Sequence, residues 1–197
     1  MKKFTPKTFN IVKLKGISEQ TIADHLKLYA GYVNNTNLIL EKIEELAKDS
    51  EKNAYALAEV QRRFGFEYDG MRNHEIYFEA LSNSAKEISK EGELYKSIVA
   101  VWGSFDAWLA RFKAIAMTRG VGWAILYLDK KEQFLMNAYV EDHQMGQLVG
   151  CTPILCLDMW EHAFIADYQP GGKKDYVDDF FVNLNWEVVE KNFKEAQ

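Results

Sequence analysis

Proline and cysteine are both scarce in this sequence of 197 residues, which contains only three prolines and two cysteines. With so few prolines and no low-complexity tract, the chain is not expected to carry a long disordered tail. The two cysteines, Cys151 and Cys156, are too few for the disulfide framework that is common in secreted proteins. We therefore expect free thiols and a cytoplasmic location.

Long apolar runs and basic clusters are missing as well. No window approaches the run of about 18 apolar residues that a membrane span needs, and the Lys-rich start is not followed by the apolar segment of a signal peptide. The net charge is −5, without a basic cluster, which argues against nucleic acid or an acidic membrane as the partner. The remaining composition, 48% apolar and 27% charged, is typical of a soluble globular protein.

Helical periodicity dominates the first half of the sequence. Ser18 is a suitable N-cap, and apolar residues recur behind it at helical spacing as far as about Ala47. Gly65 and Gly70 indicate a break in the helical pattern that follows. Two further helices are predicted on either side of this break, over residues 54–63 and 71–89.

The second half mixes helices with apolar strands. The turn D-K-K-E joins the first two of three predicted strands, which are residues 123–128, 133–140 and 152–158. Two helices are predicted before these strands, over residues 93–101 and 105–117. After the strands, one helix is predicted from near Met159 and two more over residues 175–181 and 186–193. Ser104 is expected to cap the helix over residues 105–117.

These patterns predict an α+β protein with two lobes. Residues 1–92 are expected to form an N-terminal hairpin of long helices, and residues 93–197 a C-terminal α/β lobe with a small three-stranded antiparallel sheet. A set of ligands drawn from both lobes would bind at their junction.

The sequence contains four histidines, of which three lie among apolar residues: His25, His74 and His162. A single histidine on a helix is more often a surface or hydrogen-bonded residue than a metal ligand. Asp158 changes this expectation, because a carboxylate at the end of an apolar strand needs a cation or several donors, and His162 follows it by four residues. Three imidazoles and one carboxylate suit iron, manganese or zinc better than calcium or magnesium.

The segment D-M-W-E-H-A-F, residues 158–164, resembles the D-x-W-E-H-A signature of the iron/manganese superoxide dismutases. Four further segments resemble other blocks of that family. They are T-I-A-D-H-L-K-L-Y-A-G-Y, R-N-H-E-I-Y-F, V-W-G-S-F together with V-G-W-A-I-L, and V-N-L-N-W-E-V-V. These segments occur in the family's order and extend over about residues 17–193. The resemblance therefore covers nearly the whole chain.

The resemblance implies a metal site and a reaction. The implied ligands are His25, His74, Asp158 and His162, which would bind one iron or manganese ion per subunit, with a slight preference for iron. The implied reaction is the conversion of superoxide to dioxygen and hydrogen peroxide by redox cycling of the ion.

The resemblance also implies roles around the ion. Tyr32 resembles the family's active-site tyrosine, and His143 stands where many members have a glutamine that hydrogen-bonds the metal-bound solvent. His143 could donate to that solvent or accept from it, depending on its tautomer. Trp123 and Trp160 resemble the apolar walls of the pocket, and Glu161 resembles a residue that reaches a ligand histidine across the interface of a homodimer.

Two features depart from the family pattern. His25 precedes Tyr32 by seven residues, where most members have a spacing of eight, and counting back eight leads to Asp24. Asp24 therefore stays open as the alternative first ligand, although imidazole is the family's ligand there. Tyr29 and Ile165 stand where many members have a histidine and a tyrosine that pair across the dimer at the substrate entrance.

Two other functions have to be weighed. An iron oxygenase with two histidines and one carboxylate needs more open positions than this ligand set leaves. A metal-binding relative that has lost turnover is kept as the alternative, because Tyr29 and Ile165 are altered together. Since superoxide is an anion and the protein is net negative, nearby cations such as Lys27, Lys173 or Lys174 would have to guide it.

Overall fold

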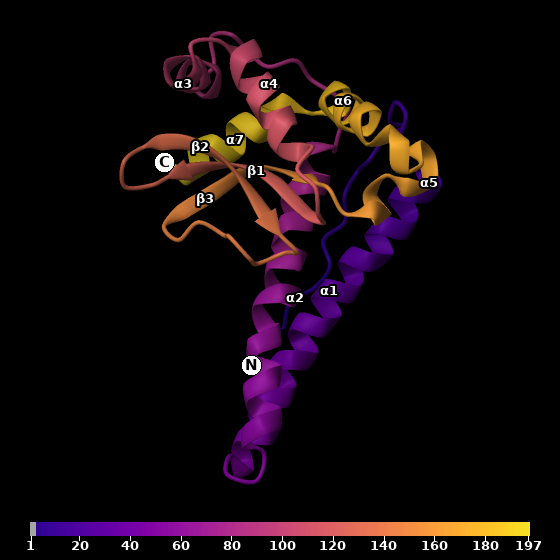
Figure 1. The fold of residues 1–197 in the computed structure, drawn as a ribbon, viewed down its shortest axis with the longest axis vertical. Helices are drawn as coiled ribbons and strands as arrows, with labels where there is room; N and C mark the ends of the chain where they lie inside the picture. The colour runs from indigo at the N-terminus through magenta and orange to yellow at the C-terminus, as the bar shows by residue number, and fades with distance from the viewer. Residues whose placement is uncertain (1–2) are drawn as a thin grey trace.

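The computed structural model describes residues 3–197 and has two parts (Figure 1). Helices α1 (Glu19–Leu46) and α2 (Ala54–Ala80) form a long hairpin, joined through the short 3₁₀ turn Ala47–Asp49. The hairpin extends away from a second part, which contains the sheet and the remaining helices (Figure 1). The predicted N-terminal hairpin of long helices is therefore confirmed.

Helix α1 begins where the sequence predicts. Oγ of Ser18 accepts a hydrogen bond from the Thr21 amide at 3.1 Å, which satisfies one of the free donors of the first turn. Most of the buried positions follow one face of the helix, and they are Ile22, His25, Tyr29, Val33 and Thr36. Because α1 is α-helical throughout, this face presents His25 to the interior.

Helix α2 shows that the prediction of two helices separated by a break is wrong. One continuous helix runs from Ala54 to Ala80, and both Gly65 and Gly70 lie inside it. At Gly70 the missing side chain has a packing reason, because a methyl group there would lie 2.8 Å from Cδ1 of Tyr32 on α1. The helix also ends earlier than predicted, since the chain then turns away with Asn83 at a positive φ of 62°.

The contact between Gly70 and Tyr32 predicts opposite effects for two glycine substitutions in α2. Gly70→Ala should destabilise the protein by about 1–3 kcal/mol, because the new methyl group has to displace the Tyr32 ring. Gly65→Ala is the matched control: its methyl group would meet only Gln144, at 3.8 Å, and alanine favours a helix by about 0.5–1 kcal/mol. Urea denaturation measures both, and equal stability of the two variants would contradict the prediction.

The second part contains the three predicted strands, which form one antiparallel sheet in the order β2-β1-β3. The strands are β1 (Gly122–Asp129), β2 (Phe134–Glu141) and β3 (Cys151–Asp158). The longer helices of this part are α3 (Glu93–Trp102), α4 (Phe105–Ala116), α6 (Lys173–Asn183) and α7 (Trp186–Ala196). Ser104 caps α4 as predicted, accepting from the Ala107 amide at 3.0 Å. The predicted sheet and these four helices are confirmed.

The chain after β3 does not enter a regular helix at Met159, as the sequence predicts. Oδ1 of Asp158 accepts a hydrogen bond from the Trp160 amide at 2.8 Å, and Trp160 is extended. The chain then makes the 3₁₀ turn Glu161–Ala163 and the short helix α5 (Ile165–Tyr168). The last of the predicted ligand histidines therefore lies on a tight turn directly after the strand.

The sheet and the hairpin share one hydrophobic core. Strand β1 is buried along nearly its whole length, and α2 packs against β3. Asp158, the last residue of β3, meets residues of both α1 and α2, so the two parts of the molecule join at the end of this strand. In the part of the chain that the structure describes, no helix has the length and apolarity to cross a membrane.

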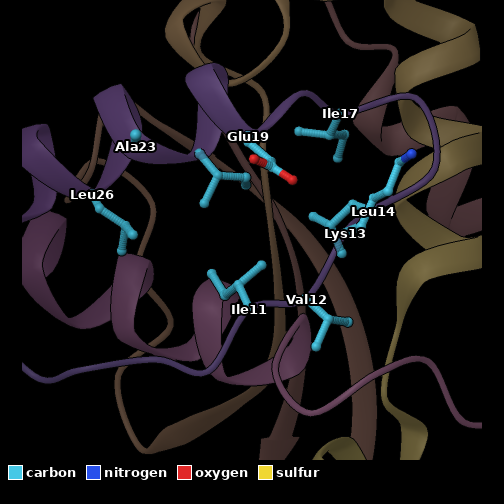
Figure 2. Close-up of a pocket in the computed structure, with 9 residues that line it drawn as sticks. Ile11, Val12, Lys13, Leu14, Ile17, Glu19, Ala23 and Leu26 are labelled. Carbon is cyan, nitrogen blue, oxygen red and sulfur yellow. The ribbon is translucent and has the colours of Figure 1, made fainter.

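The chain before α1 runs back along the hairpin, where the Phe4 amide donates to Oδ1 of Asn37 at 2.8 Å. Between this segment and the first turns of α1 lies an apolar hollow, into which Ile11 and Leu26 point (Figure 2). None of the predicted ligands lines this hollow. The end of β3, and not this hollow, is therefore the candidate site.

Candidate metal centre

Four side chains that are far apart in the sequence meet at the end of β3. They come from α1, α2, the last position of β3 and the 3₁₀ turn, and they are His25, His74, Asp158 and His162. Oδ2 of Asp158 lies 3.1 Å from Nε2 of His25, 3.1 Å from Nε2 of His162 and 3.5 Å from Nε2 of His74. One possible ligand atom of each residue lies within 4.8 Å of the others. The structure thus brings the predicted ligands together.

Asp24, the alternative first ligand, lies on the outer side of α1. Its side chain is 56% exposed and accepts a hydrogen bond from Nζ of Lys27 at 2.8 Å. Asp24 takes no part in the cluster, whereas His25, the next residue, points into it. The geometry therefore selects His25 for this position.

The hydrogen bonds of His74 leave a nitrogen lone pair facing the carboxylate. Nδ1 of His74 donates to the Gly70 carbonyl at 2.6 Å, so the neutral ring carries its lone pair on Nε2. This nitrogen is buried without a hydrogen-bond partner among residues 3–197, and it lies 3.5 Å from Oδ2 of Asp158. A lone pair facing a carboxylate is unfavourable unless a cation lies between them. The donor set therefore fits a metal ion.

Burial sets the protonation states of the cluster. The side chains of His25, His74 and Asp158 are 0% exposed, whereas that of His162 is 21% exposed. Burial lowers the pKa of His25 and lowers that of His74 well below its ordinary value. Burial alone would raise the pKa of Asp158, but His162 and His25 lower it below its usual range. At neutral pH, His25 and His74 are neutral and Asp158 is ionised, which are the forms that bind metals.

These buried groups predict that the metal-free protein loses stability in mild acid. In the folded protein the pKa of His25 is lowered and that of His74 is lowered well below its ordinary value, whereas both bind protons near pH 6.5 in the unfolded chain, so acid favours unfolding. Each such proton lowers the free energy of unfolding by about 1.4 kcal/mol per pH unit below that value. Asp69 acts in the opposite direction, because burial raises its pKa to about 6, and it offsets at most one of these protons. Urea midpoints at about pH 7.5 and about pH 5.5 test this, and equal midpoints would contradict it.

Beside the cluster, His143 lies between Trp123 and Tyr32. The indole Nε1 of Trp123 donates to Nδ1 of His143 at 2.9 Å, so neutral His143 carries its proton on Nε2. This Nε2 lies 2.7 Å from the Tyr32 hydroxyl, to which it donates. Burial lowers the pKa of His143 to about 4, which keeps the ring neutral. Of the two tautomers that the sequence left open, the structure selects the one that donates from Nε2.

Both predicted tryptophans pack against these groups. The Trp123 ring centroid lies 4.9 Å from that of His74. The Trp160 ring centroid lies 4.8 Å from that of His143 and 5.9 Å from that of His162. Apolar rings around a charged centre lower the local dielectric constant and so strengthen its electrostatic interactions.

Two family models match the sequence and together span most of the chain. The alpha-hairpin domain of iron/manganese superoxide dismutases matches residues 15–82, and their C-terminal domain matches residues 90–192. The chain belongs to the iron/manganese superoxide dismutase family. The resemblance in the five sequence segments is thereby confirmed, while the lobe boundary after residue 92 stays a prediction.

The similarity to individual relatives in this family extends over most of this chain and most of each relative. A superoxide dismutase [Mn] of Nocardia asteroides is 36% identical over 173 residues, which are 87% of this chain and 82% of the relative. A superoxide dismutase [Fe] of Aquifex pyrophilus is 35% identical over 188 residues, which are 93% and 87%. A superoxide dismutase [Fe] of Mycobacterium tuberculosis is 36% identical, with coverages of 87% and 82%. Because manganese and iron relatives are about equally similar, sequence identity does not select the metal.

Tyr29 differs from what the family pattern implies, because it does not face a substrate entrance. Its side chain is only 1% exposed, whereas the neighbouring Leu28 is 42% exposed. The Tyr29 hydroxyl donates to Oε1 of Glu75 at 3.2 Å and accepts from the Lys7 amide at 2.9 Å. Its ring stacks on that of His74, with centroids 6.5 Å apart. Tyr29 thus packs from the interior against His74, one of the candidate ligands.

Glu161 and Ile165 lie in the chain segment that follows β3. Glu161 is exposed and is the first residue of the 3₁₀ turn, next to the partly exposed His162, while Ile165 is partly buried. Within residues 3–197 the Glu161 side chain makes no hydrogen bond or ion pair. Its contact with a second subunit therefore stays a prediction.

Several contacts that hold the site in place carry no signal in the sequence. The Tyr176 hydroxyl donates to the backbone carbonyl of Asp158 at 2.9 Å. The side-chain amides of Asn73 and Gln147 donate to the carbonyl of His143 at 3.2 Å and 3.0 Å. Sequence spacing does not connect Tyr176 or Gln147 with the ligands, because these contacts join elements that only folding brings together.

Proposed function

We propose that His25, His74, Asp158 and His162 hold one iron or manganese ion, with which this dismutase converts superoxide to dioxygen and hydrogen peroxide. The observation that carries the proposal is the unpartnered Nε2 of His74, whose lone pair faces the Asp158 carboxylate. Iron binds nitrogen and oxygen ligands more tightly than manganese, so we expect iron to be favoured at equal supply. Either ion suits the donor set.

The bound ion supplies one-electron chemistry, accepting an electron from one superoxide and returning it to a second. The chain has to supply protons, because the second superoxide takes up two protons as it becomes hydrogen peroxide. Burial, and to a smaller extent the negative charge of Asp158, raises the pKa of Tyr32, so its hydroxyl stays protonated at neutral pH. Because Nε2–H of His143 donates to the Tyr32 oxygen at 2.7 Å, the phenol proton points away from His143 and is available to a substrate.

Reconstitution with single metals tests this function. Protein loaded separately with iron and with manganese should hold about one ion per chain and consume superoxide with at least one of them. Zinc is the matched control, since it takes the same ligand types but has no redox chemistry, and the zinc protein should be inactive. Full metal content without superoxide consumption would instead support the alternative, a metal-binding relative that has lost turnover.

We further propose that the protein is a cytoplasmic homodimer in which Glu161 of the partner subunit covers the exposed side of His162. Support comes from the exposure of the His162 side chain, which is 21%, beside ligands that are fully buried. If no other residue covered the exposed side of His162, protons and water could compete with the metal for its imidazole. Sedimentation of the metal-loaded protein tests the proposal, and a fully active monomer would contradict it.

A further inference from the structure

Arg63 holds a positive charge close to the pair formed by His143 and Tyr32. It lies on α2, and its guanidinium carbon is 3.6 Å from the centroid of the Phe66 ring. Nε and Nη2 of Arg63 both lie 2.9 Å from Oε1 of Glu67. A guanidinium that stacks on a ring and pairs with a carboxylate is held in a defined orientation.

The Phe66 ring connects this cation to the site. Its centroid lies 4.5 Å from that of His143, 6.1 Å from that of Tyr32 and 6.3 Å from that of Trp160. Burial is the largest influence on the pKa of His143 and of Tyr32, and the charge of Arg63 acts on both, lowering each pKa. The guanidinium is therefore one aromatic ring away from the proton-donating pair and within electrostatic range of it.

The two members of the ion pair differ in exposure. The Arg63 side chain is 50% exposed and that of Glu67 only 7%, so solvent meets the cation and not the anion. Asp158, Glu67 and Asp142 all add negative charge near Tyr32, as their effects on its pKa show. An anion that approaches Tyr32 therefore meets unfavourable charges unless an exposed cation offsets them.

Two of the lysines that the sequence suggests as guides are less suited to this task. Lys27 is exposed on the outer side of α1, where its Nζ lies 2.8 Å from a carboxylate oxygen of the exposed Asp24. Nζ of Lys173 donates to the Thr118 carbonyl at 3.0 Å, and burial lowers its pKa. Arg63 alone among these three cations contacts a ring of the site.

We propose that Arg63 guides the anionic substrate to the Tyr32 side of the metal centre, with Phe66 and Glu67 holding the guanidinium in place. This proposal rests on the proposed dismutase function. One charge roughly 10 Å from the path of a monovalent anion changes the encounter rate by about two- to five-fold at low ionic strength. At about 1 M salt the screening length is about 3 Å, and the effect disappears.

Arg63→Gln and Arg62→Gln form a matched pair, because they remove the same charge from adjacent positions of α2. Arg62 is 71% exposed and pairs with Glu59, and among the described residues its guanidinium, unlike that of Arg63, does not stack on the Phe66 ring. At low ionic strength we expect kcat/KM for superoxide to fall about two- to five-fold in Arg63→Gln and to stay unchanged in Arg62→Gln. The association rate of azide, a monovalent anion probe, should fall by the same factor when it is followed spectroscopically on the iron-loaded protein.

Arg63→Lys separates charge from packing, because lysine keeps the charge and loses the planar stack. We expect its rate to stay within about two-fold of the unaltered protein. A lysine variant as slow as Arg63→Gln, or equal rates for the Arg63→Gln and Arg62→Gln proteins at low ionic strength, would overturn the proposal.

Two further outcomes keep the test decisive. Should Arg63→Gln fail to fold, the unaltered protein and Arg63→Lys decide the matter, since rates independent of ionic strength in both would refute guidance by this charge. If the metal-loaded protein consumes no superoxide at all, the proposed function fails instead. Azide association with the same variants then still measures whether Arg63 draws anions to the site.

Discussion

Asp158→Asn is expected to remove bound iron or manganese and to abolish superoxide dismutation. Asparagine keeps the size of the side chain and an acceptor for the Trp160 amide, so the turn after β3 should persist. The substitution removes the negative charge that faces imidazole nitrogens at 3.1 Å and 3.5 Å. Loss of an outer partner of a metal ligand costs about 10–100-fold in affinity, so loss of this anionic ligand should cost at least about 100-fold.

Asp69→Asn is the control for this substitution. It makes the same chemical change at a partly buried carboxyl on α2, whose pKa burial raises to about 6 and which is not part of the ligand cluster. The control should retain about one ion per chain after dialysis against a chelator, while Asp158→Asn should retain almost none. Circular dichroism checks that both variants are folded. Full metal content in folded Asp158→Asn protein would contradict the proposed metal centre.

His143→Ala should leave the metal bound and slow turnover by about 100-fold. His143 is not one of the clustered ligands, but its Nε2 lies 2.7 Å from the Tyr32 hydroxyl and its Nδ1 accepts from Trp123 at 2.9 Å. Alanine removes the donor that orients the phenol and leaves a buried indole N–H without an acceptor. The expected loss therefore comes from a misplaced proton donor and not from loss of the ion.

His143→Gln is the matched variant for this test. A glutamine amide offers an acceptor for the Trp123 indole and a donor for Tyr32, so this variant should keep most of the turnover. The alanine variant also leaves a cavity, which costs about 2–5 kcal/mol of stability, so thermal unfolding and metal content are measured alongside the rates. Unchanged turnover in a folded, metal-loaded His143→Ala protein would rule out a role for His143 in proton supply.

Local patterns explain why much of the clustered side-chain set, though not its binding of a metal, could be predicted. Asp158 and His162 stand in one short segment, and the structure brings them to 3.1 Å. Helical periodicity placed His25 on the buried face of α1, and Ser18 marked where that helix begins. His74 was a candidate only through its apolar surroundings and the resemblance, since no spacing argument links it to the others and α2 meets β3 only in the folded protein.

The two errors in secondary structure have one physical origin. The break expected at Gly65 and Gly70 rests on a helix penalty of about 1 kcal/mol per glycine, which packing of the hairpin outweighs. At Gly70 the absence of a side chain makes room for Tyr32, 38 residues earlier in the chain. The helix expected from Met159 gives way to a turn because the Asp158 side chain bonds the Trp160 amide. In both cases the contact of one particular side chain, Tyr32 from the other helix at Gly70 and Asp158 two residues before Trp160, overrides the general helical preference of the segment.

The sequence by itself determined most of the helices and strands, the chemical types of the candidate ligands and the family, because caps, periodicity and donor chemistry are local properties. Tertiary structure alone decided which nitrogen of His74 faces the carboxylate and which nitrogen of His143 carries the proton. It also placed Tyr29 inside the protein and Arg63 against the ring of Phe66. The proton on His143 and the position of Tyr29 depend on hydrogen bonds between residues far apart in the chain, whereas His74 and Arg63 make these contacts within α2. All four residues become informative only when the fold brings them to one site.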